Sequence, residues 1–320
     1  MYYVGVNFDL TNITAGIVDE NRTICLKESV PTLRHRSFEE IIKSLAELIE
    51  RVVLKAKLDI NKDIEHVGVG CYGTIDQEKG IMIYSSYFGF KNAKLLDEIR
   101  KYIKIPVYFE NDANCYALAE SCFGATKGYN NSVIITLGTA ISGGIIVDNS
   151  VYHGAFYGAG EFGHHVIVVD GEKCDCGRRG CWAAYASLSA LVRDARIAAI
   201  RHPESEMFKM VNGDIRLMSH KIPLEAANKG DIYAKEVVYM YKRYMAIGLL
   251  NTINILQPDA IAIGGKMRKV GNEFIEDVAK MVSEKAFGQH NENKTKILLT
   301  EMDYDAVIIG ATMLGNQKQR

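Results

Sequence analysis

The sequence predicts an α/β protein of two domains, each built on a copy of one strand–turn–strand unit. The chain has 320 residues, about twice the length of a common domain. Apolar strand-like segments alternate with amphipathic helical segments along it, which is the pattern of α/β architectures. Residues 2–19 and 133–148 each resemble strand, turn and strand. They close on Gly-Ile-Val-Asp and Gly-Ile-Ile-Val-Asp, about 130 residues apart, so duplication is favoured over chance recurrence of a common strand sequence.

In the first half, strands and helices alternate. The predicted strands are residues 2–8, 15–18, 67–71 and 107–109, and the predicted helices are 37–58 and 95–102. Ser37 and Glu40 form a capping box at the start of the first helix, whose apolar residues recur at helical spacing. Functional side chains are therefore expected where strands end.

The second half continues the alternation after the strand–turn–strand segment 133–148. Asp231 caps a long predicted helix, residues 232–256, which ends at Gln257-Pro258. The remaining predicted elements are a strand at 260–263, a helix at 272–286, a strand at 296–299 and a final helix that starts near 304.

The composition excludes several classes of protein. Lys and Arg total 38 against 39 Asp and Glu, so no basic surplus indicates nucleic-acid binding. No apolar run reaches the roughly 18–20 residues of a membrane helix. The N-terminal segment has no signal-peptide pattern, and seven cysteines, an odd number, argue against a disulfide framework. We therefore expect a cytoplasmic protein with no membrane or nucleic-acid partner.

The strongest local motif is a set of metal-ligating residues, His164, Cys174, Cys176 and Cys181. Three thiolates and one imidazole complete a tetrahedral Zn²⁺ shell, and four protein ligands leave no open position for catalysis. The motif therefore predicts a structural zinc ion rather than a zinc hydrolase. His165 is an equal candidate for the fourth ligand on spacing alone, and three reduced cysteines without metal are the alternative.

A polar run follows the strand at 107–109 directly. It reads Glu110-Asn111-Asp112-Ala113-Asn114 and begins a helix that extends to Cys122. A partly buried aspartate at such a junction can serve as a general base toward a hydroxyl, which makes Asp112 the candidate catalytic residue. The alternative is that Asn111 or Asp112 only caps the helix.

Two hairpin turns and one glycine pair are candidates for nucleotide binding. The turns contain Thr11-Asn12 and Gly138-Thr139, whose small or hydroxyl side chains let backbone N–H groups approach a phosphate. One such turn in each domain would hold a phosphate chain between the domains. Gly264-Gly265 follows a buried strand and would allow close approach of an adenine or ribose. For each of these, an ordinary turn is the alternative.

Together these motifs, in this order, resemble the ROK family of sugar kinases and related repressors. The resemblance covers essentially the whole chain. It is most specific across Glu110–Asn114 and Gly158–Ser187, the second of which contains GAGEFGHH and CDCGRRGCWAAYAS. It implies a duplicated ribonuclease H-like fold of the actin/hexokinase type, with an interdomain cleft and a zinc-bearing loop. It also implies a small N-terminal domain of residues 1–116 plus 304–320 and a larger domain of residues 117–303.

The resemblance implies ATP-dependent phosphorylation of a hexose or N-acetylhexosamine, usually at the 6-hydroxyl, by a homodimer or homotetramer. Asp112 would take the hydroxyl proton, and Mg²⁺ would arrive with ATP. The implied sugar-binding residues are Gly73, Thr74, Asn111, Asp112, Glu161 and His164. The implied nucleotide-binding residues are Asp9, Thr11, Asn12, Gly138, Thr139, Gly264 and Gly265. The implied structural zinc ligands are His164, Cys174, Cys176 and Cys181, so one imidazole would serve both zinc and sugar.

Three segments depart from the family's pattern. The first phosphate loop, usually Asp-x-Gly-Gly-Thr-Lys, reads Asn7-Phe8-Asp9-Leu10-Thr11-Asn12. The second phosphate turn has Ala140 in place of a glycine, and Ala183 replaces a glutamate that normally holds a sugar hydroxyl. We hypothesise that Asp9 takes over the metal role of position 7, on the same face of a continued strand. A sugar-binding or sensor protein with impaired catalysis is the alternative function. A DNA-binding repressor is not expected, because the chain begins on the first strand of the fold.

Overall fold

The computed structural model describes residues 1–85, 87–287, 290–292 and 294–316. The chain divides into two compact units. Unit 1 comprises Met1–Ile134, Gly144–Gly160 and Thr300–Arg320, and unit 2 comprises Ile135–Gly143 and Glu161–Leu299. Residues 317–320, the end of the predicted terminal segment, lie outside the described residues. Within the described ranges, no helix combines the length and the apolar character needed to cross a bilayer.

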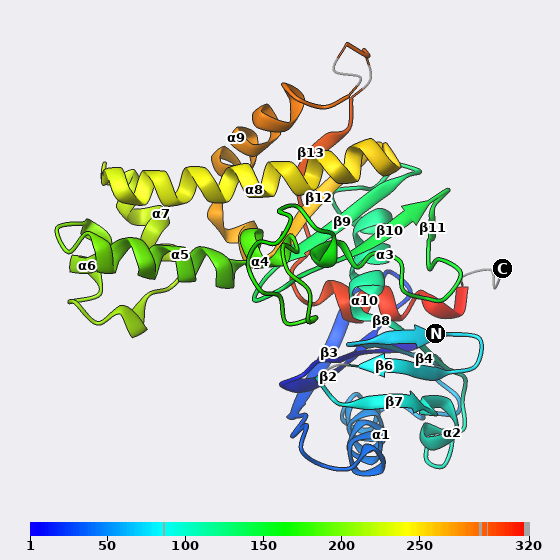
Figure 1. Ribbon diagram of the computed structural model, residues 1–320. Coiled ribbons are helices and arrows are strands. Elements are labelled where there is room, and N and C mark those ends of the chain that lie inside the picture. The colour runs from blue at the N-terminus through cyan, green and yellow to red at the C-terminus, as the bar shows by residue number, and fades with distance from the viewer. Residues whose placement is uncertain (86, 288–289, 293, 317–320) are drawn as a thin grey trace. The chain divides into compact units, whose positions relative to one another are not determined.

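Five strands form the main sheet of unit 1, in the order β3-β2-β1-β4-β8 (Figure 1). They are β1 (Tyr2–Phe8), β2 (Asn12–Val18), β3 (Ile24–Pro31), β4 (Ile64–Cys71) and β8 (Val107–Asn111). β1, β4 and β8 are parallel, whereas β2 is antiparallel to both of its neighbours. The carboxyl ends of the three parallel strands therefore meet at one edge, where α/β sheets bind ligands.

The turn between β1 and β2 is tighter than the sequence predicts. β1 ends at Phe8 as expected, but β2 begins at Asn12 instead of residue 15. The backbone N–H of Asp9 donates to the carbonyl of Asn12 at 3.0 Å, and Asp9 Oδ1 accepts from the N–H of Leu10 at 2.6 Å. These local bonds turn the chain at Asp9. The expectation that the strand continues to Asp9, on the face of Asn7, is therefore wrong.

Helix α1 (Phe38–Lys55) carries the predicted capping box. The Ser37 side chain accepts from the backbone N–H of Glu40, and the Glu40 carboxylate accepts from the N–H of Ser37. Its apolar face is buried in one hydrophobic core with the strands of the main sheet. The helix ends three residues before the predicted boundary at 58.

Helix α10 (Ala306–Ala311) lies directly on the backbone of the main sheet. A Cβ atom at Gly5 of β1 would lie 2.1 Å from the carbonyl oxygen of Ile308, and one at Gly68 of β4 would lie 1.8 Å from that of Ala311. On its other side, a Cβ atom at Gly310 would lie 1.8 Å from the carbonyl oxygen of Cys115 in α3 (Asp112–Phe123). Only glycine permits these approaches, so α10 packs between the sheet and α3.

A second, three-stranded sheet of unit 1 has the order β5-β6-β7. Its elements are β5 (Thr74–Asp76), β6 (Ile81–Ser85) and β7 (Phe90–Ala93). Helix α2 (Leu95–Ile99) follows and is shorter than the predicted helix over 95–102, because the chain leaves the helix as turns after Ile99. β5 matters for function since it follows Gly73, a candidate site residue.

The other five-stranded sheet has the order β11-β10-β9-β12-β13. Its strands are β9 (Ser132–Leu137), β10 (Ile141–Val147), β11 (Ser150–Val151), β12 (Ala260–Gly265) and β13 (Lys296–Leu299). In both sheets the third, second, first, fourth and fifth strands along the chain are neighbours in that order. The predicted duplication of the fold is thus visible in the strand order itself.

The helices of unit 2 lie between and after these strands. They are α4 (Ala183–Ala186), α5 (Leu188–Arg201), α6 (Glu206–Met210), α7 (Lys221–Asn228), α8 (Ile232–Leu256) and α9 (Asn272–Ser283). The predicted long helix is confirmed as α8, and Asp231 caps it by accepting from the N–H groups of Tyr233 and Ala234. The predicted helix 272–286 is confirmed as α9 but ends at Ser283.

Candidate active site

Two of the predicted sugar-binding segments meet at the carboxyl edge of the main sheet in unit 1. Asn111 ends β8, and its Nδ2 atom donates to the carbonyl oxygen of Gly73 at 3.0 Å. Gly73 has a φ of +144°, and a Cβ atom there would lie 2.7 Å from the carbonyl oxygen of Tyr84, so glycine is required. This contact places Gly73-Thr74 beside Asn111-Asp112, as the resemblance implies.

The cap and the candidate base are separate residues. Asn111 is the N-cap of α3, and its side-chain oxygen accepts from the N–H of Asn114 at 3.1 Å. Asp112 is the first residue of the helix and is partly exposed. A carboxylate in this first turn is favoured by the helix dipole. The predicted alternative, that a residue here caps the helix, therefore applies to Asn111.

Glu110 lies beneath this turn with its side chain almost fully buried. Its Oε1 atom accepts from the N–H of Asn111 at 2.6 Å and from Nδ2 of Asn114 at 3.0 Å. Its Oε2 atom lies 2.8 Å from Nε2 of His153, which follows β11. His153 was not predicted as a site residue, because a lone histidine in a loop carries no pattern and its partner is 43 residues away in the chain.

The first phosphate turn holds Asp9, Thr11 and Asn12. Asp9 Oδ2 lies 3.5 Å from Thr11 Oγ1, which in turn accepts from Nδ2 of Asn12 at 3.2 Å. The hydroxyl of Thr32 donates to the carbonyl of Asp9 at 2.7 Å. The turn is therefore ordered by its own polar side chains rather than by glycines.

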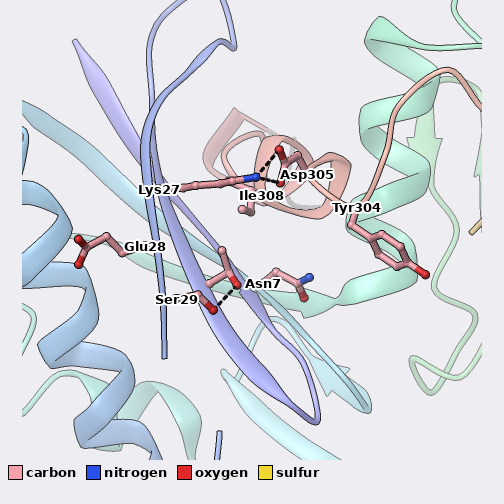
Figure 2. Close-up of a pocket in the computed structure, with 8 residues that line it drawn as sticks. Asn7, Lys27, Glu28, Ser29, Tyr304, Asp305 and Ile308 are labelled. Atoms are coloured by element: carbon pink, nitrogen blue, oxygen red, sulfur yellow. Dashed lines mark hydrogen bonds and ion pairs between the residues drawn. The ribbon is translucent and has the colours of Figure 1, made fainter. Parts of the chain in front are cut away.

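A pocket of about 360 Å³ opens beside this turn in unit 1 (Figure 2). Its lining residues are Asn7, Thr14, Lys27, Glu28, Ser29, Tyr304, Asp305 and Ile308. Lys27 reaches the carboxylate of Asp305 at 2.7 and 2.8 Å, and the hydroxyls of Thr14 and Ser29 lie 3.0 Å apart. Asn7, one of the departures from the family's pattern, faces this pocket, but none of the predicted site residues lines it.

The nucleotide candidates of unit 2 lie close together. The Gly138 N–H donates to the carbonyl of Ala140 at 3.0 Å, and the Gly138 carbonyl accepts from the N–H of Leu188 at 2.9 Å. Gly265 has a φ of +72°, and a Cβ atom there would lie 2.6 Å from the carbonyl oxygen of Leu137. Gly264 and Gly265 are the last residues of β12 rather than a turn after it, and the close approach joins β12 to the end of β9. Thr139 is exposed at the tip of the turn.

The four predicted zinc ligands converge in unit 2. His164 Nδ1 lies 3.5 Å from Cys174 Sγ, and Cys176 Sγ lies 3.6 Å from Cys181 Sγ. All four ligand atoms lie within 4.8 Å of one another. The ligand atoms of a tetrahedral zinc site lie roughly 3.5–3.8 Å apart, given bonds of about 2.0–2.3 Å. The donor set and its spacing therefore fit Zn²⁺.

The two adjacent histidines have different surroundings. His165 lies against Trp182, with ring centroids 5.2 Å apart, and its buried Nε2 atom has no hydrogen-bond partner in the described part of the chain. Burial lowers the pKa of His165, because it disfavours the charged imidazolium. His164 instead directs Nδ1 at the thiols, so the geometry selects His164 from the two candidates that spacing left equal.

The thiols form a strongly polarised cluster. Burial raises the pKa of Cys176, but hydrogen bonds, chiefly from Arg178, outweigh it and lower the pKa to about 6. Burial and the hydrogen bond with Cys176 raise the pKa of Cys181 to about 12. Zinc requires thiolates, so a bound cation would supply the charge that Cys181 needs to ionise.

The zinc loop lies against the second phosphate turn within unit 2. A Cβ atom at Gly163, in the short turn η1 (Phe162–His164), would lie 2.5 Å from the carbonyl oxygen of Ile141 at the start of β10. The same atom would lie 3.3 Å from the Cβ of Ala183. Glu161 directly precedes η1. The position where the family has a glutamate is thus adjacent to the segment that carries Glu161 and His164.

Comparison with known proteins identifies the fold and the family of this chain. The fold is the two-domain α/β fold of ROK hexokinases, and the ROK family profile matches residues 3–318, so the chain belongs to the ROK family. A glucokinase of Streptomyces coelicolor is 30% identical over 98% of this chain and 97% of its own length. A crystal structure of a ROK family glucokinase from Streptomyces griseus in complex with glucose and AMPPNP superposes with a TM-score of 0.83. It is 30% identical and covers 99% of this chain and 100% of that one.

The family also contains regulators. A xylose repressor of Caldicellulosiruptor bescii is 29% identical to this chain, over 85% of this chain and 67% of its own length. Membership of the family alone therefore does not separate a kinase from a repressor. The residues of the site must make that distinction.

Proposed function

We propose that this protein is an ATP-dependent sugar kinase that phosphorylates a hexose or an N-acetylhexosamine, with Asp112 as the general base. One observation carries the proposal. Asp112 begins α3 at the carboxyl edge of the main sheet, partly exposed, while Asn111 supplies the helix cap and contacts Gly73. The glucokinases among its relatives support ATP as the phosphoryl donor.

Asp112 acts on the proton of the sugar hydroxyl. As the hydroxyl oxygen, in our proposal the 6-hydroxyl, attacks the γ-phosphorus of ATP, the carboxylate accepts the hydroxyl proton. The bond between the γ-phosphorus and the bridging oxygen breaks, and ADP leaves. Catalysis of this kind depends on positioning and charge neutralisation more than on covalent chemistry.

The other site residues bind and orient the substrates. Gly73, Thr74, Asn111, Glu161 and His164 contact sugar hydroxyls. The nucleotide phosphates and ribose contact Asp9, Thr11, Asn12, Gly138, Thr139, Gly264 and Gly265. Mg²⁺ bound with ATP neutralises phosphate charge. We propose that the two domains of the kinase are residues 1–116 plus 304–320 and residues 117–303.

The zinc ion has a structural role in this proposal. His164, Cys174, Cys176 and Cys181 hold it, and it fixes the segment that carries Glu161 without taking part in the chemistry. Ala183 has a much smaller side chain than the glutamate that the family has at this position. The space that this leaves next to the segment favours a sugar with a larger substituent, such as an N-acyl group. We further propose a cytoplasmic homodimer or homotetramer.

The test is an ADP-release assay across a panel of hexoses and N-acetylhexosamines, comparing the wild type with Asp112→Asn. We expect activity with at least one sugar and a loss of about 10²–10⁴-fold in kcat in the variant, with sugar-induced thermal stabilisation retained. Asp97→Asn, an exposed carboxylate on α2, is the control and keeps full activity. Activity that survives in Asp112→Asn would refute the assignment of the base.

The altered phosphate loops favour one other function. Asn7 and Asn12 stand where the family has an acid and a lysine, and Ala140 stands where it has a glycine. Those changes suit a protein that binds sugar without phosphoryl transfer. Thermal stabilisation by a sugar, with no ADP release for any member of the panel, would identify that function instead.

A further inference from the structure

The buried carboxyl group of Glu110 needs hydrogen-bond partners. Its side chain is 1% exposed, and burying an unpaired carboxylate is costly. No lysine or arginine in the described part of the chain pairs with it; the ion pair it makes is with His153, at 2.8 Å. His153 is itself mostly buried, with a side chain 22% exposed.

Glu110 transmits this contact to the catalytic turn. The oxygen that does not face His153 accepts from the N–H of Asn111 and from the side chain of Asn114, both within the first turn of α3. Asn111 and Asn114 also bond to each other across the cap. The orientation of the Glu110 carboxylate thus fixes the backbone immediately before Asp112.

His153 also anchors its own loop. Its carbonyl accepts from the N–H of Ala159 at 3.1 Å. In the same loop, the hydroxyl of Tyr157 bonds to the carboxylate of Asp76 in β5. The loop is therefore fastened to β5 through Tyr157, and the chain continues from it into Glu161.

We propose that His153 is a positioning residue for the kinase reaction. Through Glu110 it holds the turn that presents Asn111 and Asp112. The inference rests on the proposed function and adds to it a residue that contacts neither sugar nor nucleotide. Because it acts, through Glu110, on the sugar-binding Asn111 and on the base, its loss affects both kcat and the KM for sugar.

The test compares steady-state kinetics of the wild type, His153→Ala and His153→Gln. In His153→Ala we expect kcat to fall about 10- to 100-fold and the KM for sugar to rise, with the KM for ATP unchanged. His153→Gln retains an amide that can donate to Glu110 and recovers part of the loss. His202→Ala removes an exposed histidine–glutamate pair and is the matched control, with no expected change.

A second variant isolates the route through Glu110. Glu110→Gln removes the buried charge and keeps an oxygen for the Asn111 N–H. We therefore expect His153→Ala combined with Glu110→Gln to be more active than His153→Ala alone. A loss in kcat with both KM values unchanged and no recovery in the double variant would mean that less protein is folded, and would overturn the inference. Wild-type kinetics in His153→Ala would overturn it while leaving the kinase proposal intact. Failure of the wild type on every sugar would end both.

Discussion

At the scale of single residues, the site separates two tasks that one side chain often performs. Asn111 caps α3 and contacts Gly73, which leaves the Asp112 carboxylate without a capping duty. The cap of α3 therefore does not depend on Asp112.

This division predicts different effects for two substitutions at position 111. Asn111→Ala loses both the cap and the Gly73 contact, and we expect it to lower the free energy of unfolding by about 1–2 kcal/mol. Asn111→Ser keeps a capping oxygen, so we expect a smaller fall in the free energy of unfolding, of about 1 kcal/mol. Urea denaturation measures both. Equal losses would show that the cap contributes little.

Asp9 was misplaced and His153 was missed in the sequence analysis for physical reasons. Asp9 was expected on the strand face of Asn7, but its carboxylate bonds to the next backbone N–H and turns the chain. His153 was not singled out, because its role depends on Glu110, which only the fold brings near. By contrast, the convergence of His164, Cys174, Cys176 and Cys181 was predictable, since all four lie in one short segment.

At the scale of elements, apolar periodicity predicts the helix α10 but not how closely it packs on the main sheet. The sequence predicts a helix from residue 304, and α10 forms from Ala306. Apolar periodicity gives no sign that glycines of two strands would lie against its backbone carbonyls. That packing depends on the absence of side chains at Gly5 and Gly68, which no pattern of hydrophobic residues records.

This packing predicts that Gly68→Ala is destabilising. The new Cβ atom would lie 1.8 Å from the carbonyl oxygen of Ala311, so α10 or β4 must shift. We expect the free energy of unfolding to fall by about 1–3 kcal/mol. Gly158→Ala is the control, because nothing lies within 4 Å of its Cβ position. A Gly68→Ala protein as stable as the control would contradict the close approach.

The end of α10 also predicts a pH dependence of stability. His66 of β4 is buried between Tyr3 and Tyr108, and its Nε2 atom lies 3.0 Å from the carbonyl of Thr312. Burial lowers the pKa of His66 below its ordinary value of 6.5. Above that value both states are neutral and the contribution of His66 is complete. As pH falls below 6.5 the unfolded chain binds the proton first, so stability is lost down to the folded pKa.

We expect this loss to reach at most about 1.4 kcal/mol per pH unit for this group. Measuring the free energy of unfolding between pH 7 and 5 for the wild type and His66→Gln tests it. The variant should have the shallower slope, whereas His35→Gln, an exposed histidine, should match the wild type. Identical slopes for wild type and His66→Gln would exclude His66 as the source.

At the scale of the whole molecule, the two five-stranded sheets share one strand order, β3-β2-β1-β4-β8 and β11-β10-β9-β12-β13. The duplication was predictable from the first two strands of each sheet, whose sequences end alike. The elements inserted into each copy could not be predicted in this way. The β5-β6-β7 sheet and the helices α5 to α7 are inserted between the repeated strands, and the described part of the other copy has no counterpart of them.

The zinc loop predicts a property of the intact protein, since its metal would fix the sugar-binding segment. We expect purified protein to hold about one zinc ion per chain by elemental analysis, and its removal by a chelator to lower the melting temperature and raise the KM for sugar. Cys176→Ser and His164→Ala should lose the metal, whereas Cys25→Ser, an exposed cysteine elsewhere, should keep it. His165→Ala should also keep it, because that imidazole lies against Trp182 and not among the thiols. Metal loss in His165→Ala with retention in His164→Ala would reverse the assignment of the fourth ligand.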